Sequence, residues 1–243
     1  MTGKLYIVGT PIGNLGDITL RALETLKEVD LVACEDTRVT AKLLTRYEIK
    51  KSLVSIHQHS KVSKLDKVVQ ELENGKNVAL VTDAGTPGIS DPGNQLVAEA
   101  IKNNIEVTPI PGVSALTTIL SVAGIDTQKF IFLGFPPHKK GRVTFFKEVL
   151  QSKIPVVFFE STHRIIKNLE LLAVIASEAK QSLDKKNKIA TSSSTSRNDI
   201  RVIIGKELTK MFEEVIRGNI QEALEYLKND PAKQKGEFVI IVY

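Results

Sequence analysis

The chain has 243 residues, 42% of them hydrophobic, and a formal net charge of +5 at pH 7. This length suffices for one large or two small α/β domains, each with its own core. The charge favours a polyanionic partner, because Lys and Arg side chains release the counterions that condense on phosphates. Net charge alone does not identify that partner.

Cys34 is the single cysteine, which excludes an intramolecular disulfide and favours a reducing compartment. The first residues lead into a strand-like segment at 5–8 without the apolar core of a signal peptide. Apolar runs in the chain stay well short of the ~20 residues of a membrane span. We therefore expect a cytoplasmic protein without a membrane partner.

Short apolar runs alternate with helix-like segments over the first half of the chain. In the first helix Leu20, Leu23, Leu26 and Val29 repeat every third residue, and Asp17 stands where an N-cap is expected. The expected strands are residues 5–8, 31–34, 53–56, 78–81 and 105–110, and further helices are expected at 40–47, 62–74, 94–102 and 114–123. This alternation predicts a parallel sheet with crossover helices.

The second half has longer irregular connections, which predict a mixed sheet. The expected strands are residues 130–135, 155–159, 200–204 and 237–242, and the expected helices are 143–151, 164–172 and 220–229. Proline and glycine at 109–112 mark a change of connectivity. We therefore predict an N-terminal α/β domain at 1–112 and a C-terminal α/β domain at 113–243.

Residues 174–199 differ in composition from the rest of the second half. They contain eight Ser or Thr and no aromatic residue. A segment of this kind buries too little apolar surface to offset its chain entropy, so we predict a polar insertion on the surface, partly disordered. A basic arm that contacts RNA is the alternative.

The most informative loop is 82–93, which follows the apolar run at 78–81. Its three glycines, two prolines and two aspartates are typical of a strand whose carboxyl end opens onto a ligand crevice. Lys102 is the single cation between Asn77 and Gln128, and the chain has no G-K-[ST] pattern for a triphosphate. The loop therefore predicts a neutral or cationic ligand.

Three further loops follow expected strands. Residues 9–17 carry glycines that allow close approach of the backbone to a ligand, with a plain tight turn as the alternative. Residues 35–38 combine two carboxylates, a hydroxyl and a guanidinium, which could orient and deprotonate a hydroxyl substrate and bind a phosphate. The alternative is an acidic helix N-terminus with an exposed Arg. Residues 111–115 place backbone amides and a small hydroxyl at the same crevice.

Metal binding is poorly supported, and we predict no metal. His57 and His59 form the one close histidine pair and lack an obvious third ligand. The apolar strand around Cys34 favours a small core residue over a nucleophile.

Together these motifs resemble the ribosomal RNA small subunit methyltransferase I family, in the tetrapyrrole methylase superfamily of class III methyltransferases. The resemblance covers nearly the whole chain in order, at residues 9–15 with 17–19, 35–38, 83–93, 111–115, 160–164, 206–210 and 235–238. It implies S-adenosyl-L-methionine as methyl donor and the ribose 2′-hydroxyl of a decoding-centre cytidine in 16S ribosomal RNA as acceptor. It also implies a homodimer with the cofactor held folded between two α/β domains.

The resemblance and the charge pattern assign roles to particular residues. Asp36 or Glu35 is the candidate base, and Arg38 is the candidate phosphate anchor. The proposed cofactor-binding residues are Pro11, Asp83, Ala84, Gly85, Thr86, Gly88, Ile89, Ser114, Ala115, Phe135 and Gly236. The proposed RNA-binding residues are Arg38, Lys139, Lys140, Arg142, His163 and Arg164.

Two departures from the family pattern stand out. The insertion after residue 174 replaces a short turn, and Thr162 stands where the family has a proline, so we expect a looser turn there. Two other functions remain open: a C-methyltransferase that acts on a tetrapyrrole, and a ribosome-assembly factor that binds RNA without catalysis. The residues at 35–38 and the basic second half speak against the first, and the cofactor loops speak against the second.

Overall fold

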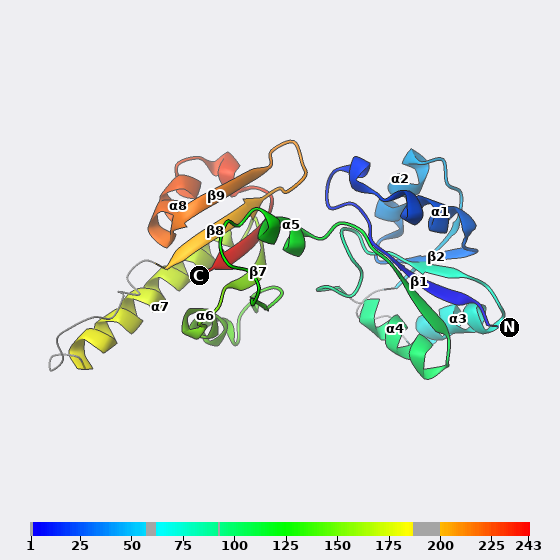
Figure 1. Cartoon of the computed structure of the whole chain (residues 1–243), viewed down its shortest axis with the longest axis horizontal. Helices are drawn as coiled ribbons and strands as arrows, with labels where there is room; N and C mark the ends of the chain where they lie inside the picture. Colours follow the sequence, from blue (N-terminus) through cyan, green and yellow to red (C-terminus); the bar gives the residue numbers. More distant parts are fainter. Residues whose placement is uncertain (1, 57–61, 92, 187–199) are drawn as a thin grey trace. The chain divides into compact units, whose positions relative to one another are not determined.

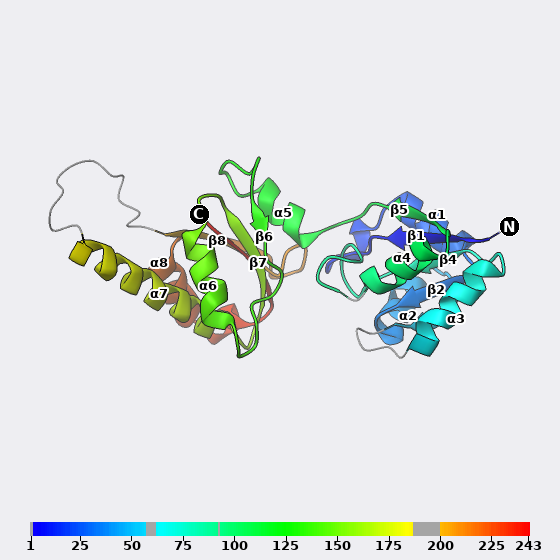
Figure 2. The same ribbon diagram turned by 90° about the horizontal axis from the view of Figure 1, so that it is seen from below.

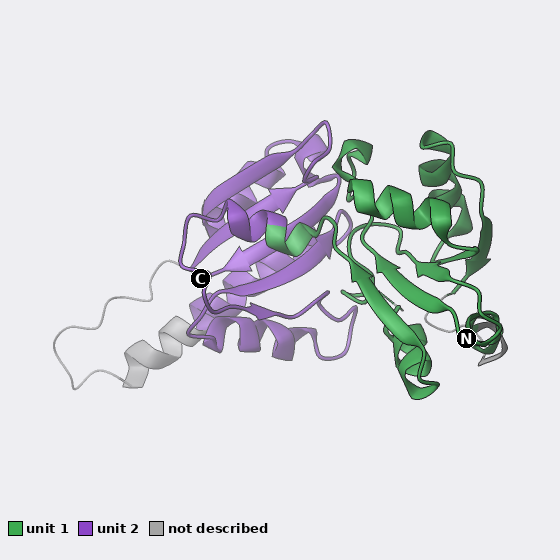
Figure 3. Ribbon diagram, turned by 45° about the vertical axis from the view of Figure 1, so that its right-hand side comes forward, with its two compact units in different colours: residues 1–117 green, residues 118–243 purple. Residues whose placement is uncertain are grey.

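A computed structural model describes residues 2–56, 62–91, 93–186 and 200–243. The chain divides into two compact units, Met1–Thr117 and Thr118–Tyr243 (Figure 3). The boundary predicted after residue 112 lies shortly before this division. Within the described residues, every helix is too short or too polar to cross a membrane.

The first unit is a five-stranded parallel sheet with helices on both faces (Figures 1 and 2). Its strands are β1 (Lys4–Val8), β2 (Leu31–Cys34), β3 (Ser52–Ser55), β4 (Val78–Leu80) and β5 (Glu106–Ile110), in the spatial order β3-β2-β4-β1-β5. Its helices are η1 (Leu15–Asp17), α1 (Leu20–Glu28), α2 (Thr37–Arg46), α3 (Val62–Glu73) and α4 (Gly93–Lys102). The predicted parallel sheet is confirmed.

The two faces of this sheet are covered by different helices. Leu26 of α1 and Leu44 of α2 pack against one face, whereas Leu72 of α3 and Leu96 of α4 pack against the other. The connections from β1 to β3 run toward one edge of the sheet and those from β3 to β5 run back. Because parallel crossovers are right-handed, reversing the direction moves the helices to the opposite face.

The N-cap of α1 differs from the prediction. The Thr19 side chain accepts a hydrogen bond from the Ala22 backbone N–H at 3.1 Å and caps α1, while Asp17 ends the preceding 3₁₀ helix η1. Ile18 between them has an extended backbone. The helix therefore cannot start from Asp17, and the first apolar residue of the pattern, Leu20, follows its true cap directly.

The second unit is a mixed sheet, as predicted. Its strands are β6 (Ile131–Phe132), β7 (Val156–Ser161), β8 (Arg201–Lys206), β9 (Glu214–Asn219) and β10 (Glu237–Val242), in the spatial order β6-β7-β10-β8-β9. The pairing of β6 with β7 is parallel and the other three are antiparallel. The helices are α6 (Arg142–Gln151), α7 (Ile165–Lys186), α8 (Ile220–Lys228) and η2 (Pro231–Gln234), while α5 (Ala115–Ser121) spans the division between the units.

The edge strand β9 is absent from the sequence prediction. It pairs only with β8 in this sheet, and most of its residues are partly exposed. Val215 and Ile216 are its only large apolar residues, and Gly218 with Asn219 resembles a turn. An edge strand with one paired side needs little apolar sequence, so its formation depends on the neighbouring strand.

The segment from residue 174 was predicted as an irregular polar stretch on the surface. This is wrong for residues 174–186, which are helical. Helix α7 continues to Lys186, and Ile175 is 6% exposed within the core of the second unit. Leu169, Leu172 and Ile175 recur every third residue and extend the buried stripe of the helix. The frequent Ser and Thr further along concealed this periodicity. Residues 187–199 lie outside the described residues.

This packing predicts unequal effects at two adjacent positions of α7. Ile175→Ala should lower the free energy of unfolding by about 3 kcal/mol, because it leaves a cavity in the core. Val174→Ala is the matched control, since Val174 is 51% exposed and should change stability by less than about 0.5 kcal/mol. Urea unfolding measures both values. Equal, small losses would show that the helix does not pack here.

Candidate active site

The parallel sheet of the first unit opens a crevice at the carboxyl end of β4. This strand lies between β2 and β1 in the sheet, but α4 follows it onto the face opposite to α1 and α2. The chain therefore leaves the neighbouring strands β2 and β4 toward opposite faces of the sheet. Ligands of α/β proteins bind at such switch points, outside the carboxyl ends of the strands.

Backbone and hydroxyl hydrogen bonds join the loops at this edge. The Thr10 N–H donates to the Gly85 carbonyl at 2.9 Å, and the Gly85 N–H donates back to Thr10 at 3.1 Å. The buried Thr10 hydroxyl donates to the Thr82 carbonyl at 3.1 Å. The Thr86 hydroxyl donates to the Val113 carbonyl at 3.3 Å. The loops after β1, β4 and β5 thus form one connected structure.

Glycine is required where these loops approach each other. A Cβ atom on Gly9 would lie 2.7 Å from the Gly112 Cα. Gly85 has a φ of 84°, and a Cβ atom there would lie 3.3 Å from Ile12 Cγ2. A side chain at Gly9 or Gly112 would separate the ends of β1 and β5, while one at Gly85 would strain the loop after β4.

The far part of the β4 loop is held by Asp91. Its Oδ1 accepts hydrogen bonds from the Gly88 N–H at 2.7 Å and from the Gly93 N–H at 2.9 Å. Asn94 Nδ2 donates to the Gly88 carbonyl at 3.1 Å. The loop is therefore shaped from within and presents the exposed residues Asp83, Ala84 and Ile89 outward.

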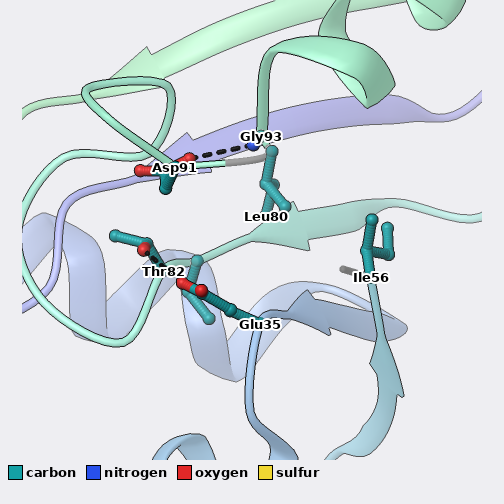
Figure 4. Close-up of a pocket in the computed structure, with 7 residues that line it drawn as sticks. Glu35, Ile56, Leu80, Thr82, Asp91 and Gly93 are labelled. Carbon is teal, nitrogen blue, oxygen red and sulfur yellow. Dashed lines mark hydrogen bonds between the residues drawn. The ribbon is translucent and has the colours of Figure 1, made fainter. Parts of the chain in front are cut away.

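A small pocket lies at the carboxyl ends of β2, β3 and β4 (Figure 4). The side chains of Glu35 and Thr82 face each other there, and the Thr82 hydroxyl lies 3.3 Å from Glu35 Oε2. The residues that line the pocket are Glu35, Ile56, Leu80, Val81, Thr82, Asp91 and Gly93. Carboxylates from two loops thus border an apolar floor, where they can orient a hydroxyl group.

Asp36 has a structural function at the start of α2. Its side chain accepts the Arg38 backbone N–H at 2.8 Å and pairs with the Arg38 guanidinium, where Nη2 lies 2.6 Å from Oδ2. These contacts with Arg38 lower the pKa of Asp36 from 3.8 to about 2. The Asp36 N–H donates to Asp83 Oδ1 at 3.0 Å. The structure therefore shows the acidic helix N-terminus beside an exposed Arg that was the alternative interpretation of residues 35–38.

Cys34, directly before these carboxylates, is a core residue. Its side chain is fully buried, and burial raises the pKa of its thiol. A buried thiol with a raised pKa is a poor nucleophile.

Arg164 of the second unit does not fit the predicted role of a free phosphate ligand. Its Nε lies 2.9 Å from Oε1 of the fully buried Glu160 side chain, and its Nη1 donates to the Pro136 carbonyl at 2.9 Å. Asn168 donates a further hydrogen bond to Glu160. A carboxylate buried at the end of β7 requires a cation, and Arg164 one turn away supplies it.

Thr162 does not loosen the turn after β7. Its hydroxyl donates to the Gly236 carbonyl at 2.8 Å and accepts from the Gly236 N–H at 2.7 Å. Gly236 has a φ of 126°, and a Cβ atom there would lie 2.5 Å from Glu207 Cγ. Two side-chain hydrogen bonds thus hold the turn in place of the ring that a proline would provide.

The other predicted residues of the second unit lie near its surface. Phe135 is 50% exposed, and its ring packs edge-on against Phe159. Lys139, Lys140 and His163 are exposed, and Arg142 is the first residue of α6. In the first unit, Pro11 is buried, and Ser114 and Ala115 are partly buried at the loop after β5. The described part of the chain holds no metal-binding cluster, and His57 and His59 lie outside it.

The chain is similar to known proteins over nearly its whole length. A family profile of tetrapyrrole (corrin/porphyrin) methylases matches residues 4–224. A protein of Halalkalibacterium halodurans named ribosomal RNA small subunit methyltransferase I is 42% identical over 99% of this chain and 75% of its own length. The protein of the same name in Thermotoga maritima is 41% identical over 99% of this chain and 98% of its own length.

The chain belongs to the ribosomal RNA small subunit methyltransferase I family. This confirms the resemblance inferred from the motifs. Solved structures of tetrapyrrole methylases share its fold. A cobalt precorrin-4 methyltransferase of cobalamin biosynthesis has a TM-score of 0.64 at 16% identity, and covers 98% of this chain and 94% of its own. The methyltransferase CobJ has a TM-score of 0.65 at 13% identity, over 99% and 94% of the two chains.

Three residues of the candidate site are missing from the sequence prediction. Thr10 and Thr82 join the loops, and Asp91 shapes the β4 loop and lines the pocket. The position of Thr82 directly after an apolar strand could have indicated a site residue. The sequence around Thr10 gave no such indication, because its hydroxyl binds carbonyl groups more than 70 residues away in sequence.

The buried pair in the second unit predicts a large stability effect. Arg164→Met should lower the free energy of unfolding by about 3 kcal/mol, because it leaves the buried Glu160 without its cation. Lys167→Met is the control, since it removes an exposed cation from the same helix and should have little effect. Adding Glu160→Gln to Arg164→Met should recover part of the loss. Equal stability of the two single variants in thermal unfolding would contradict a structural role for Arg164.

Proposed function

We propose that this protein transfers a methyl group from S-adenosyl-L-methionine to the ribose 2′-hydroxyl of a decoding-centre cytidine in 16S ribosomal RNA, in the cytoplasm. Methyltransferase activity follows from family membership. The observation that carries the finer proposal is the pairing of Glu35 with Thr82 beside glycine loops that contain no cation. The relatives named as ribosomal RNA methyltransferases support RNA as the acceptor.

The loops at the sheet edge fit this cofactor. Residues 9–17, 82–91 and 111–115 contain no Lys or Arg, and Asp83 offers a carboxylate at the exposed side. S-adenosylmethionine supplies an electrophilic methyl group on a cationic sulfonium. In our proposal the first-unit contacts are Pro11, Asp83, Ala84, Gly85, Thr86, Gly88, Ile89, Ser114 and Ala115, with Phe135 and Gly236 from the second unit. The positive φ of Gly85 and Gly88 lets the backbone come close to a ligand.

Glu35 is the residue that we propose as the base. A ribose hydroxyl is a weak acid, so a group in contact with it must orient it and accept its proton as the oxygen attacks. Glu35 lines the pocket, whereas both oxygens of Asp36 are engaged by Arg38. With a pKa of about 2, Asp36 would hold a proton weakly. We propose that Asp36 positions Arg38, which binds a phosphate next to the acceptor ribose.

The proposed RNA contacts of the second unit are polar residues at its surface. They are the exposed Lys139, Lys140 and His163 and the partly exposed Arg142. We leave out Arg164, because its guanidinium is used by Glu160 and Pro136. The resemblance also supports a homodimer as the active form, which light scattering of the purified protein can test.

The cofactor assignment predicts that a side chain at Gly85 blocks binding. Gly85→Val should weaken S-adenosylmethionine affinity at least about tenfold in calorimetry, because the new side chain meets Ile12 and strains the loop that we propose binds the cofactor. Gly124→Val is the control: Gly124 has a similar φ of 69° but lies in the second unit with open space around it. It should carry the same backbone strain and leave affinity unchanged. Equal affinities in two folded variants would remove this loop from the cofactor site.

The two neighbouring carboxylates should respond differently to isosteric replacement. Glu35→Gln should lower kcat by roughly 10²-fold to 10⁴-fold, as expected for loss of a general base, with cofactor affinity retained. Asp36→Asn should retain more activity, because Asn also caps a helix and only the charge at Arg38 is lost. A 2′-O-methylation assay on small-subunit RNA, followed by mapping of the modified nucleotide, measures both. A larger loss for Asp36→Asn would assign the proton transfer to Asp36.

The lowered pKa of Asp36 also predicts the pH dependence. Its folded pKa lies below 3.8, so its charge stabilises the fold above that pH, and the contribution is lost as pH falls through about 2. Asp36 therefore stays ionised between about pH 5 and pH 9. Any inflection of the rate in this range should therefore persist in Asp36→Asn, displaced at most by the removal of a neighbouring charge. Loss of the inflection in that variant would show that Asp36 is the group that titrates during catalysis.

A further inference from the structure

Helix α2 carries a row of cations that begins at the candidate active site. Arg38, Lys42 and Arg46 follow each other at intervals of four residues and are all exposed. The buried residues of the helix, Thr40, Leu43 and Leu44, occupy the opposite side. We refer to Arg38, Lys42 and Arg46 as the α2 cation row.

The spacing of this row suits a polyanion that runs along the helix. A separation of four residues corresponds to about 6 Å of helix rise, so the row extends about 12 Å from Arg38 to Arg46. Each step of four residues also turns the position by only about 40°, which keeps the three side chains on one side of the helix. Evenly spaced cations of this kind can meet successive phosphates of one strand.

The charge of this face is not compensated within the helix. Helix α2 contains no Asp or Glu, and its nearest carboxylate, the Asp36 cap, pairs with Arg38. Among the described residues, no ion pair joins Lys42 or Arg46 to a carboxylate. Ordinary solvated helix faces commonly mix both signs of charge, whereas this one offers a single sign to a partner.

We propose that the α2 cation row binds the phosphates of the RNA strand that leaves the active site, with Lys42 and Arg46 contacting nucleotides beyond the one at Arg38. This inference rests on the proposed function, because it requires an RNA acceptor at the carboxyl edge of the sheet. Lys42 and Arg46 lie in α2, beyond residues 35–38. They would contribute to RNA affinity and to the direction in which the RNA strand runs from the active site. They would not take part in the methyl transfer.

The test compares two double variants with the same loss of charge. Lys42→Ala with Arg46→Ala removes the outer part of the row, and Lys27→Ala with Lys67→Ala removes two exposed cations of α1 and α3. Binding to protein-free small-subunit RNA is measured between about 50 mM and 200 mM salt. Each lost phosphate contact on a single strand should reduce the slope of log affinity against log salt by about 0.7, so the row variant should lose about 1.4. The control should retain the wild-type slope.

Methylation by the same variants separates the two proposals. The row variant should show a raised KM for RNA, with kcat at saturating RNA and cofactor affinity unchanged. If wild-type protein methylates RNA but the two double variants have equal slopes, the row is not an RNA contact and the proposed function stands. If the row variant binds assembled small subunits more weakly but naked RNA normally, the row contacts ribosomal protein, which also overturns the inference. If wild-type protein methylates neither, the proposed function itself fails.

Discussion

The structure of the active-site edge depends on the backbone pairing between Thr10 and Gly85. These two hydrogen bonds join the loops after β1 and β4, and the contact between Gly9 and Gly112 brings the end of β5 beside them. Because backbone atoms make the contacts, the loops hold a fixed shape without long side chains. Asp83, Ala84 and Ile89 are exposed on the outer side of this loop.

Charge is distributed unevenly around this edge. The glycine loops lack cations, which suits a cationic donor, while Arg38 marks the point where phosphate binding would begin. Asp36 lies between these two regions: it fixes Arg38 through the start of α2 and touches the β4 loop through its N–H. One residue thereby connects the proposed RNA anchor to the proposed cofactor loop.

Most strands and helices were predictable, because burial imposes a period on apolar residues. The exceptions share a physical cause. Edge strand β9 is stabilised by pairing with β8, and α7 extends past residue 174 because Ile175 meets a core built from other elements. The pairing of Arg164 was not predictable for the same reason, since its partner Glu160 is a buried carboxylate that looks like any other acid in the sequence.

The sequence by itself determined the parallel and mixed sheets, the family, and the loops that form the candidate site, since periodicity, glycine and proline act locally on the chain. Only the tertiary structure decided which carboxylate faces the pocket. Glu35 meets Thr82, which is 47 residues away, while its neighbour Asp36 turns to Arg38. The sequence alone does not distinguish the roles of Glu35 and Asp36, because both are acids at the end of the same strand. Their side chains have different partners because β4 lies next to β2, and that adjacency exists only in the folded sheet.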